Sequence, residues 1–148
     1  MTLKTRITED MKAALRARET ARLSTIRLLL AAIKQKEVDE RVELGEADVV
    51  GIIDKMIKQR RESIAQFDRG SRPDLAAAEQ AEIDILQAYM PKPLSEAEID
   101  TLVADAVEKA GASGMSAMGR VMSVLKAELA GRADMSQVSA KVKARLAQ

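Results

Sequence analysis

The chain has 148 residues, of which 47% are hydrophobic and 32% are charged, a composition typical of one soluble domain or of two small helical ones. It contains no Cys and no His, which excludes disulfides, thiolate chemistry, histidine-based catalytic triads and the usual zinc sites. With no Trp, and with Phe67 and Tyr89 as its only aromatic residues, it lacks the stacking platforms that read unpaired RNA bases.

Composition also bears on the cellular compartment. The longest wholly apolar run, residues 28–33, is much shorter than the roughly 18 residues that a membrane-spanning helix needs. Residues 1–22 are basic and amphipathic like a transit peptide, but Glu9 and Asp10 interrupt that composition and the helical pattern continues past them. We therefore expect these residues to belong to the fold, and we expect a cytoplasmic protein that does not contact a membrane.

Apolar residues recur at helical spacing along the N-terminal part, and no segment shows the alternation typical of β-strands. The pattern predicts a helix over residues 2–17 and a second one over residues 23–42, with Gly45 as the left-handed residue that ends it. A third helix over residues 49–67 is predicted to end before the Gly-Ser-Arg-Pro segment at 70–73.

With the residues that flank these apolar runs, the second and third predicted helices have similar lengths of about 24 residues, or about 36 Å at 1.5 Å per residue. Equal lengths and a short connection containing Gly45 favour a long antiparallel hairpin. A shorter fourth helix over residues 75–89 must end before Pro91. We therefore predict that residues 1–90 form an N-terminal helical hairpin domain with flanking helices.

Residues 91–94 contain two prolines and are the predicted linker. Ser95 and Glu98 then form the pattern of a capping box, which begins a helix. Two more helices follow, one over residues 118–129 that stops at Gly131 and one over residues 138–146 that is capped by Asp134. The prediction is an all-α protein whose residues 95–148 form a small C-terminal three-helix domain.

Charge is distributed unevenly along the chain. Residues 73–118 hold two cations against nine carboxylates, whereas residues 119–148 hold six cations against two carboxylates. A basic segment of this kind can bind phosphates in a salt-dependent manner without reading base sequence. The alternative is a solvated helix face with cations placed favourably near helix C-termini. The six cations are Arg120, Lys126, Arg132, Lys141, Lys143 and Arg145.

Two short motifs resemble binding sites without meeting their requirements. Residues 114–120 (GMSAMGR) have glycine spacing similar to that of a phosphate-binding loop, but Arg120 and Val121 replace the required Lys and hydroxyl residue, and no strand precedes them. Glu79, Glu82 and Asp84 could be a carboxylate cluster for a metal, but the His that a di-metal bundle needs is absent. We therefore assign no cofactor and no metal, and favour an acidic surface helix.

Two further patterns leave alternatives open. Arg60 falls on the apolar stripe of the third predicted helix, where it needs a carboxylate or carbonyl partner. A structural ion pair within the hairpin is favoured over a contact with RNA or a partner protein. Met118 and Met122 are predicted to be core residues rather than a docking groove, and for Met115 both interpretations stay open.

Four ordered blocks carry a family resemblance that covers nearly the whole chain. They are RLSTIRLLLAAIKQKEVD, IDKMIKQRRES, EIDILQAYMPKPLSEAEI and MGRVMSVLKAELAGRAD. Together they resemble the GatB/YqeY family, and specifically its stand-alone YqeY-like proteins. The resemblance implies an all-α fold in two parts. It also implies that the C-terminal part is similar to the tail domain of the GatB subunit of tRNA-dependent amidotransferase, which amidates Glu-tRNA(Gln) or Asp-tRNA(Asn).

The match to the tail motif includes Gly119, Met122, Lys126, Gly131 and Asp134. Arg120 stands where family members often have Lys, and Met135 stands where many have a small residue. We expect Gly119 to permit close helix packing and Gly131 to adopt a left-handed turn.

The resemblance implies a non-catalytic, tRNA-associated module, because the tail domain helps to hold the tRNA while the chemistry lies in other domains. The family label is carbon–nitrogen ligase with glutamine as amido donor, and proteins of aminoacyl-tRNA synthesis are the implied partners. We assign no catalytic residue. The alternative is a helical protein–protein adaptor or homo-oligomeric scaffold without RNA binding. The expected RNA-binding residues are Arg120, Lys126, Arg132, Lys141 and Lys143.

Overall fold

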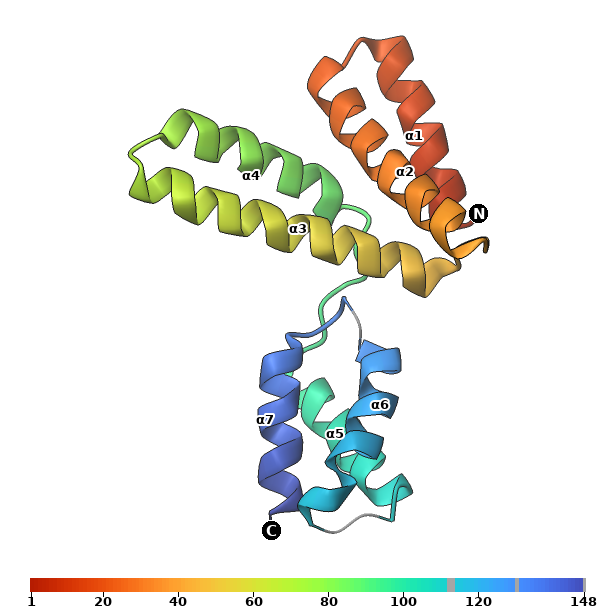
Figure 1. Ribbon diagram of the computed structural model, residues 1–148, viewed down its shortest axis with the longest axis vertical. Coiled ribbons are helices and arrows are strands. Elements are labelled where there is room, and N and C mark those ends of the chain that lie inside the picture. The colour runs from red at the N-terminus through yellow and green to blue at the C-terminus, as the bar shows by residue number, and fades with distance from the viewer. Residues whose placement is uncertain (112–113, 130, 148) are drawn as a thin grey trace. The chain divides into compact units, whose positions relative to one another are not determined.

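The computed structural model describes residues 1–111, 114–129 and 131–147. Within these ranges the chain forms seven α-helices and one short 3-10 helix and contains no strand, which confirms the all-α prediction (Figure 1). The chain divides into two compact units, Met1–Met90 and Pro91–Gln148. None of the helices so described combines the length and the apolar character needed to cross a bilayer.

The N-terminal unit consists of four helices around one apolar core. They are α1 (Leu3–Ala17), α2 (Thr20–Glu40), α3 (Glu46–Arg69) and α4 (Pro73–Gln87). Each helix contributes side chains that are almost completely buried, because apolar residues at spacings of three and four share one helix face. The most deeply buried large residues are Ile7, Ile26, Leu29, Ile33, Ile53 and Leu86.

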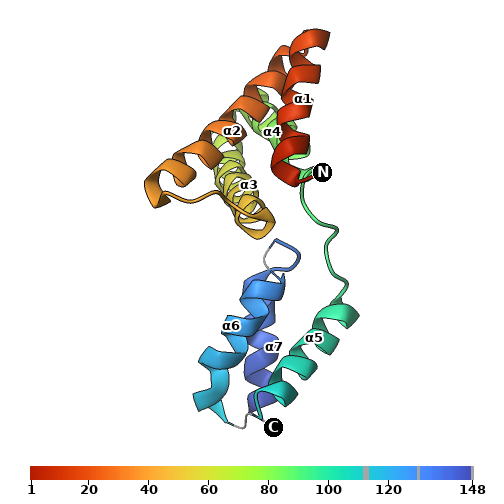
Figure 2. The same ribbon diagram turned by 90° about the vertical axis from the view of Figure 1, so that its right-hand side faces the viewer.

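The predicted long hairpin of the second and third helices is wrong. In the N-terminal unit α1 pairs with α2 and α3 pairs with α4, whereas α2 meets α3 over only a short region (Figures 1 and 2). Helix length and loop length do not show which neighbour an apolar face covers. The apolar stripe of α3 has α4 as its main partner, although α4 is the shorter helix.

The chain reversal between α2 and α3 also differs from the prediction. The left-handed residue that ends α2 is Arg41, with a φ of 55°, and not Gly45. Gly45 has a φ of −84° and is the N-cap of α3, where its amide donates to the Asp48 carboxylate at 3.3 Å. A glycine between two helices fits either role, so its presence did not distinguish the end of one from the start of the next.

One ion pair connects α1 with the last turns of α2. The Lys4 ammonium lies 2.7 Å from the Glu37 carboxylate, which also accepts from the Leu44 amide at 3.0 Å. These two hydrogen bonds, the one from Lys4 first, hold the pKa of Glu37 below its ordinary value. The carboxylate therefore stays ionised while it connects α1, α2 and the following loop.

Tyr89, just beyond the end of α4, connects this helix with α1. Tyr89 is 4% exposed, and its hydroxyl donates to the Asp10 carboxylate at 2.6 Å. The Arg6 guanidinium lies 5.0 Å from the ring centroid and donates to the Ala88 carbonyl at 3.2 Å. A cation over an aromatic ring and a charge-assisted hydrogen bond both stabilise this junction.

Tyr89 gives a direct prediction for alkaline pH. Burial, and then the hydrogen bond to Asp10, raise its pKa from 10.0 to about 12. Because the folded state disfavours tyrosinate, the contribution of Tyr89 to stability should be constant below pH 10 and should decrease as the pH rises towards about 12. The chain has a single Tyr, so ultraviolet absorbance of tyrosinate follows this one group. We expect the Asp10→Asn variant to titrate at a lower pH but still above 10, and a native midpoint at 10 would contradict the buried position.

The C-terminal unit contains α5 (Glu96–Lys109), a 3-10 turn at Met115–Ala117, α6 (Met118–Leu129) and α7 (Met135–Leu146). Its core is separate from that of the first unit and is built from one stripe on each helix. The predicted capping box is confirmed, because the Glu98 amide donates to the Ser95 hydroxyl at 3.1 Å and the Ser95 amide donates to the Glu98 carboxylate at 3.4 Å. The core residues that are fully buried are Val121, Leu125, Leu129, Val138 and Val142.

Candidate nucleic-acid interface

The predicted RNA-binding residues all lie in or between α6 and α7. These helices run antiparallel and bury residues four positions apart, which leaves their remaining faces for polar side chains. Met118 and Met122 are partly buried against this core, as predicted. The side chain of Met115 lies outside the described residues, so neither interpretation of it is tested.

The turn between α6 and α7 is held by its backbone and by one cap. Gly131 has a φ of 76°, which confirms the predicted left-handed turn. The Arg132 amide donates to the Leu129 carbonyl at 2.9 Å, and the Arg132 carbonyl accepts from the Leu94 amide at 2.9 Å. Asp134 caps α7 as predicted, accepting from the Ser136 amide at 2.9 Å. Arg132 therefore projects from a well-defined turn.

The expected role of Gly119 in close helix packing is wrong. Apart from its own turn of α6, a Cβ atom built on Gly119 would meet none of the described residues within 4 Å, and Gly119 is exposed. None of the described helices therefore explains the glycine by close packing. Its match to the tail motif therefore has no packing explanation in this structure.

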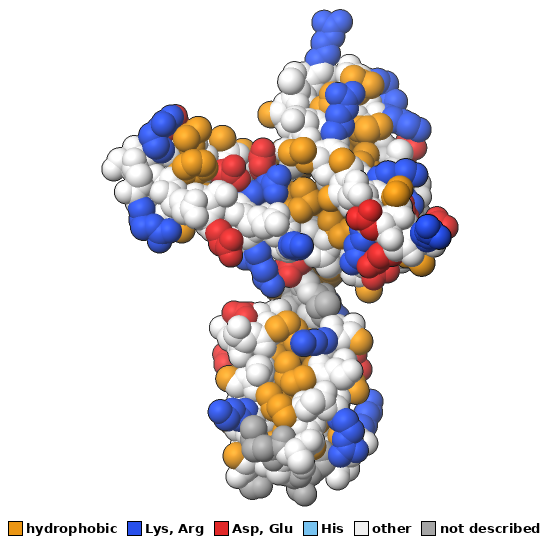
Figure 3. Space-filling view, viewed as in Figure 1, with side chains coloured by type: hydrophobic (Ala, Val, Ile, Leu, Met, Phe, Trp, Pro, Cys, Tyr) orange, Lys and Arg blue, Asp and Glu red, His pale blue; other side chains and the backbone are white. Residues whose placement is uncertain are grey.

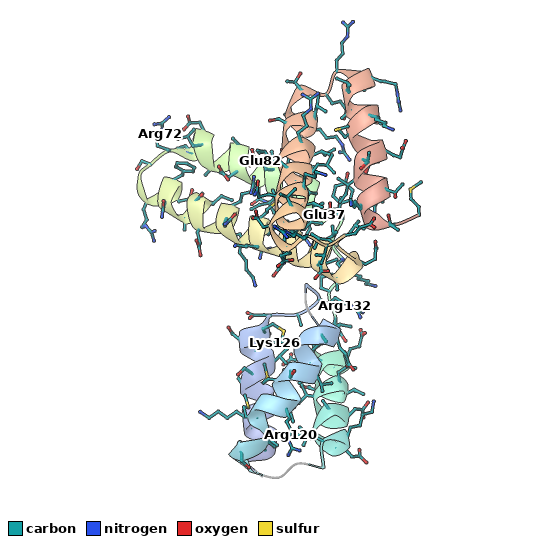
Figure 4. The ribbon with its side chains drawn as sticks, turned by 45° about the vertical axis from the view of Figure 1, so that its right-hand side comes forward. Glu37, Arg72, Glu82, Arg120, Lys126 and Arg132 are labelled. Atoms are coloured by element: carbon teal, nitrogen blue, oxygen red, sulfur yellow. The ribbon has the colours of Figure 1, made fainter. Side chains whose placement is uncertain are left out.

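The cations extend along α6 instead of gathering at one point. Arg120, Lys126 and Arg132 follow one another from the first turn of α6 to the turn beyond its end (Figure 4). Arg120 and Lys126 are exposed and Arg132 is half-buried. At 100° and 1.5 Å per residue, Arg120 and Lys126 are separated by about 120° around the helix and about 9 Å along it. This spacing allows them to contact successive phosphates of one backbone.

Lys141 differs from the other four predicted residues. Its ammonium lies 2.7 Å from the Asp100 carboxylate and 3.2 Å from the Glu96 carboxylate, both on α5. Hydrogen bonds to Asp100 and then to Glu96 raise the pKa of Lys141 above its ordinary value. Its charge is therefore already balanced. Glu96 and Asp100 were not anticipated from the sequence, although their spacing of four places both on one face of α5.

Lys143 lies about 200° around α7 from Lys141, on the side turned away from those carboxylates. Of the five predicted residues, only Lys141 makes an ion pair within the part of the chain that the structure describes. Of the five, the cations that can still meet a phosphate are therefore Arg120, Lys126, Arg132 and Lys143.

The C-terminal unit has opposite charges on its different helices. Five carboxylates and one cation lie on α5, whereas six cations and two carboxylates lie on α6, α7 and the turn between them. Figure 3 views the unit with α6 and α7 in front, and Lys and Arg side chains lie on both sides of an apolar band there. This separation makes the α6 and α7 side the one that attracts a polyanion.

The other candidate sites have structural explanations. Arg60 forms the predicted ion pair, with its Nε atom 2.7 Å from the Glu82 carboxylate, but the partner lies on α4 and not within the predicted hairpin. Glu82 therefore binds a cation of this chain. Within residues 1–111, 114–129 and 131–147, no three acidic side chains are arranged to hold a metal.

Comparison with known proteins identifies relatives. The family model for Yqey-like proteins matches residues 4–146. The chain is similar to "Altered inheritance of mitochondria protein 41, mitochondrial" of Eremothecium gossypii, with 42% identity over 100 residues, which is 66% of this chain and 55% of that protein. The protein of the same name from Pyrenophora tritici-repentis is 36% identical over 143 residues, 93% of this chain and 77% of that protein.

The Lachancea thermotolerans protein of that name is 40% identical over 100 residues. The chain spans about half the length, 53% to 55%, of the curated relatives that it matches first. Their names also contradict the expected cytoplasmic location, because they are called mitochondrial. The absence of Cys and of a long apolar run does not distinguish the cytosol from the interior of an organelle, which is why composition was misleading here.

Proposed function

The chain belongs to the YqeY-like protein family, and from this premise we propose that it is a non-catalytic helical module that binds tRNA through α6 and α7. The observation that carries the proposal is the separation of charge in the C-terminal unit. Carboxylates gather on α5, while Arg120, Lys126, Arg132 and Lys143 stand on the other helices without ion pairs in the described structure. A folded RNA backbone is a ligand that this pattern of cations suits.

The expected mode of binding is recognition of shape and phosphate. The cations are spread along a helix of 12 residues, about 18 Å, which is long enough to contact several phosphates in succession. The unit has no aromatic residue that could stack on an unpaired base. Contacts of this kind position a folded RNA without reading its sequence.

The resemblance of the C-terminal unit to the tail of an amidotransferase subunit gives the proposal its biological setting. In that setting the module holds tRNA for reactions of aminoacyl-tRNA synthesis whose chemistry is carried out by other proteins. The chain would then carry the family label of carbon–nitrogen ligase without performing that reaction by itself.

Binding of unmodified tRNA across a salt series tests the proposal. We expect the triple variant Arg120→Glu, Lys126→Glu, Lys143→Glu to bind at least tenfold more weakly. Its slope of log affinity against log salt should decrease by about 0.7 to 0.9 for each phosphate that the variant no longer binds. Lys109→Glu, at the exposed end of α5, is the matched control within the same unit and should leave both quantities unchanged.

A Lys141 variant distinguishes binding by the cations without ion pairs from a general effect of positive charge. Because its ammonium is already held by Glu96 and Asp100, Lys141→Ala should lower tRNA affinity much less than Lys126→Ala does. If the triple variant keeps both its affinity and its salt slope, α6 and α7 are not the RNA-binding surface and the proposal is wrong.

A further inference from the structure

Helix α2 carries apolar side chains on two opposite sides. One side, with Ile26, Leu29 and Ile33, is completely buried in the N-terminal unit. On the opposite side Leu28 is 49% exposed and Val38 is 59% exposed. Single exposed apolar residues are ordinary on a protein surface, so the case for a partner depends on what surrounds Leu28 and Val38 on this side of α2.

Three apolar residues and one glutamine follow a regular spacing on the outer side of α2. Leu28, Ala31, Gln35 and Val38 are separated by three, four and three residues, and all four are exposed. We call these four residues the outer stripe of α2. This spacing brings residues to one line along a helix and is the spacing that packs against a second helix in a coiled coil. The stripe is therefore suited to contact with a helix.

Shallow hollows lie at both ends of the outer stripe. One is lined by Leu23, Arg27 and Leu28 together with small polar residues. The other is lined by Val38 and the half-exposed Val42, together with the cations Lys4, Lys34 and Arg41 and the carboxylates Glu37 and Glu43. The first hollow can therefore receive an apolar side chain that is accompanied by a carboxylate, whereas in the second Glu37, which is paired with Lys4, and Glu43 offset part of the positive charge.

Cations follow one side of the outer stripe. Arg27 and Lys34 immediately precede Leu28 and Gln35, and Arg41 continues the same spacing of seven residues at the end of α2. None of these three makes an ion pair among the described residues, and Figure 3 shows cationic and apolar side chains side by side over α1 and α2. On the other side Asp39 accepts a hydrogen bond from Gln35 at 2.9 Å.

We propose that the outer stripe of α2 binds an amphipathic helix of a partner protein whose apolar residues are flanked by Asp or Glu. The spacing of the stripe favours a helical partner, and the row of cations favours a partner helix that carries carboxylates. Antiparallel pairing with a second copy of this chain fits less well, since it would place the two rows of cations against each other. RNA fits less well because phosphates gain nothing from Leu28 and Val38.

A designed peptide tests the proposal with the full chain. The probe is a fluorescent 21-residue amphipathic helix with Leu along its apolar seam and Glu at the flanking positions, and the control peptide has Lys in place of Glu. We expect fluorescence anisotropy to show binding of the Glu peptide and at least tenfold weaker binding of the Lys peptide. Leu28→Ser with Val38→Ser should weaken binding of the Glu peptide tenfold or more.

A charge exchange makes the test specific. Arg27→Glu with Lys34→Glu should reverse the preference, so that the Lys peptide binds more tightly than the Glu peptide. Arg61→Glu with Arg69→Glu is the matched control, because both residues are exposed on α3 away from the stripe, and it should change nothing. All substituted residues are exposed, so the thermal transitions of the variants should match that of the parent chain.

Three results would overturn the proposal. Equal binding of the two peptides would remove the selection for acidic partners. A concentration-dependent dimer that Leu28→Ser with Val38→Ser dissociates would assign the stripe to a second copy. A loss of tRNA affinity in the Arg27→Glu, Lys34→Glu variant without peptide binding to the parent chain would assign the stripe to RNA. The triple variant in α6 and α7 should bind the Glu peptide normally, so this surface and the tRNA surface can fail separately.

Discussion

Replacing Leu125 by Ala is expected to unfold the C-terminal unit while the N-terminal unit stays folded. Leu125 is completely buried at the centre of α6. Truncation of a buried Leu removes about 2 to 5 kcal/mol, whereas the core of so small a domain rarely supplies more than about 3 to 5 kcal/mol. The two units have separate apolar cores, so the loss should remain within one of them.

Hydrogen exchange on the full chain measures this result. Amides of α5, α6 and α7 should lose their protection in Leu125→Ala, while those of α2 and α3 keep theirs. Val124→Ala is the control, because Val124 is the neighbouring residue and is 47% exposed, so its truncation should change stability by less than about 0.5 kcal/mol. Equal loss of protection in both units would show that they fold as one cooperative structure.

The sequence predicts where the helices are better than it predicts how they pair. Helix positions depend on local features, such as the capping box at Ser95 and the stop at Gly131, and these were found. Pairing depends on which apolar faces meet, and α2 has apolar residues on two sides. Pattern alone could not show that its buried side faces α1 or that α3 packs against α4.

The candidate sites could also be predicted only in part from the sequence. The separation of basic and acidic segments was visible in the sequence, but the pairing of Lys141 with Glu96 and Asp100 joins residues more than 40 positions apart. The row of Arg27, Lys34 and Arg41 was also visible as a spacing of seven. Its proposed role in binding became apparent only from the exposure of Leu28 and Val38 on the neighbouring side of α2.

The ion pair between Arg60 and Glu82 is expected to stabilise the pairing of α3 with α4. The Arg60 side chain is 13% exposed, and it donates to both Glu82 at 2.7 Å and the Met56 carbonyl at 3.1 Å. Glu82→Gln leaves a largely buried guanidinium without a counter-charge, which should cost about 2 to 3 kcal/mol of unfolding free energy. Arg60→Met should cost less, since Glu82 is 33% exposed and can be hydrated.

Chemical denaturation of the two single variants and the double variant measures the coupling between these residues. A contact of this kind should give a coupling energy between about 0.5 and 3 kcal/mol, with the double variant losing less than the sum of the single losses. Arg61→Met, at the adjacent exposed position of α3, should leave stability nearly unchanged. If Arg60 instead binds RNA, Arg60→Met would lower tRNA affinity while the coupling to Glu82 is absent. Because the guanidinium is enclosed by α3 and α4, we expect the opposite pattern: measurable coupling, and tRNA affinity equal to that of the parent chain.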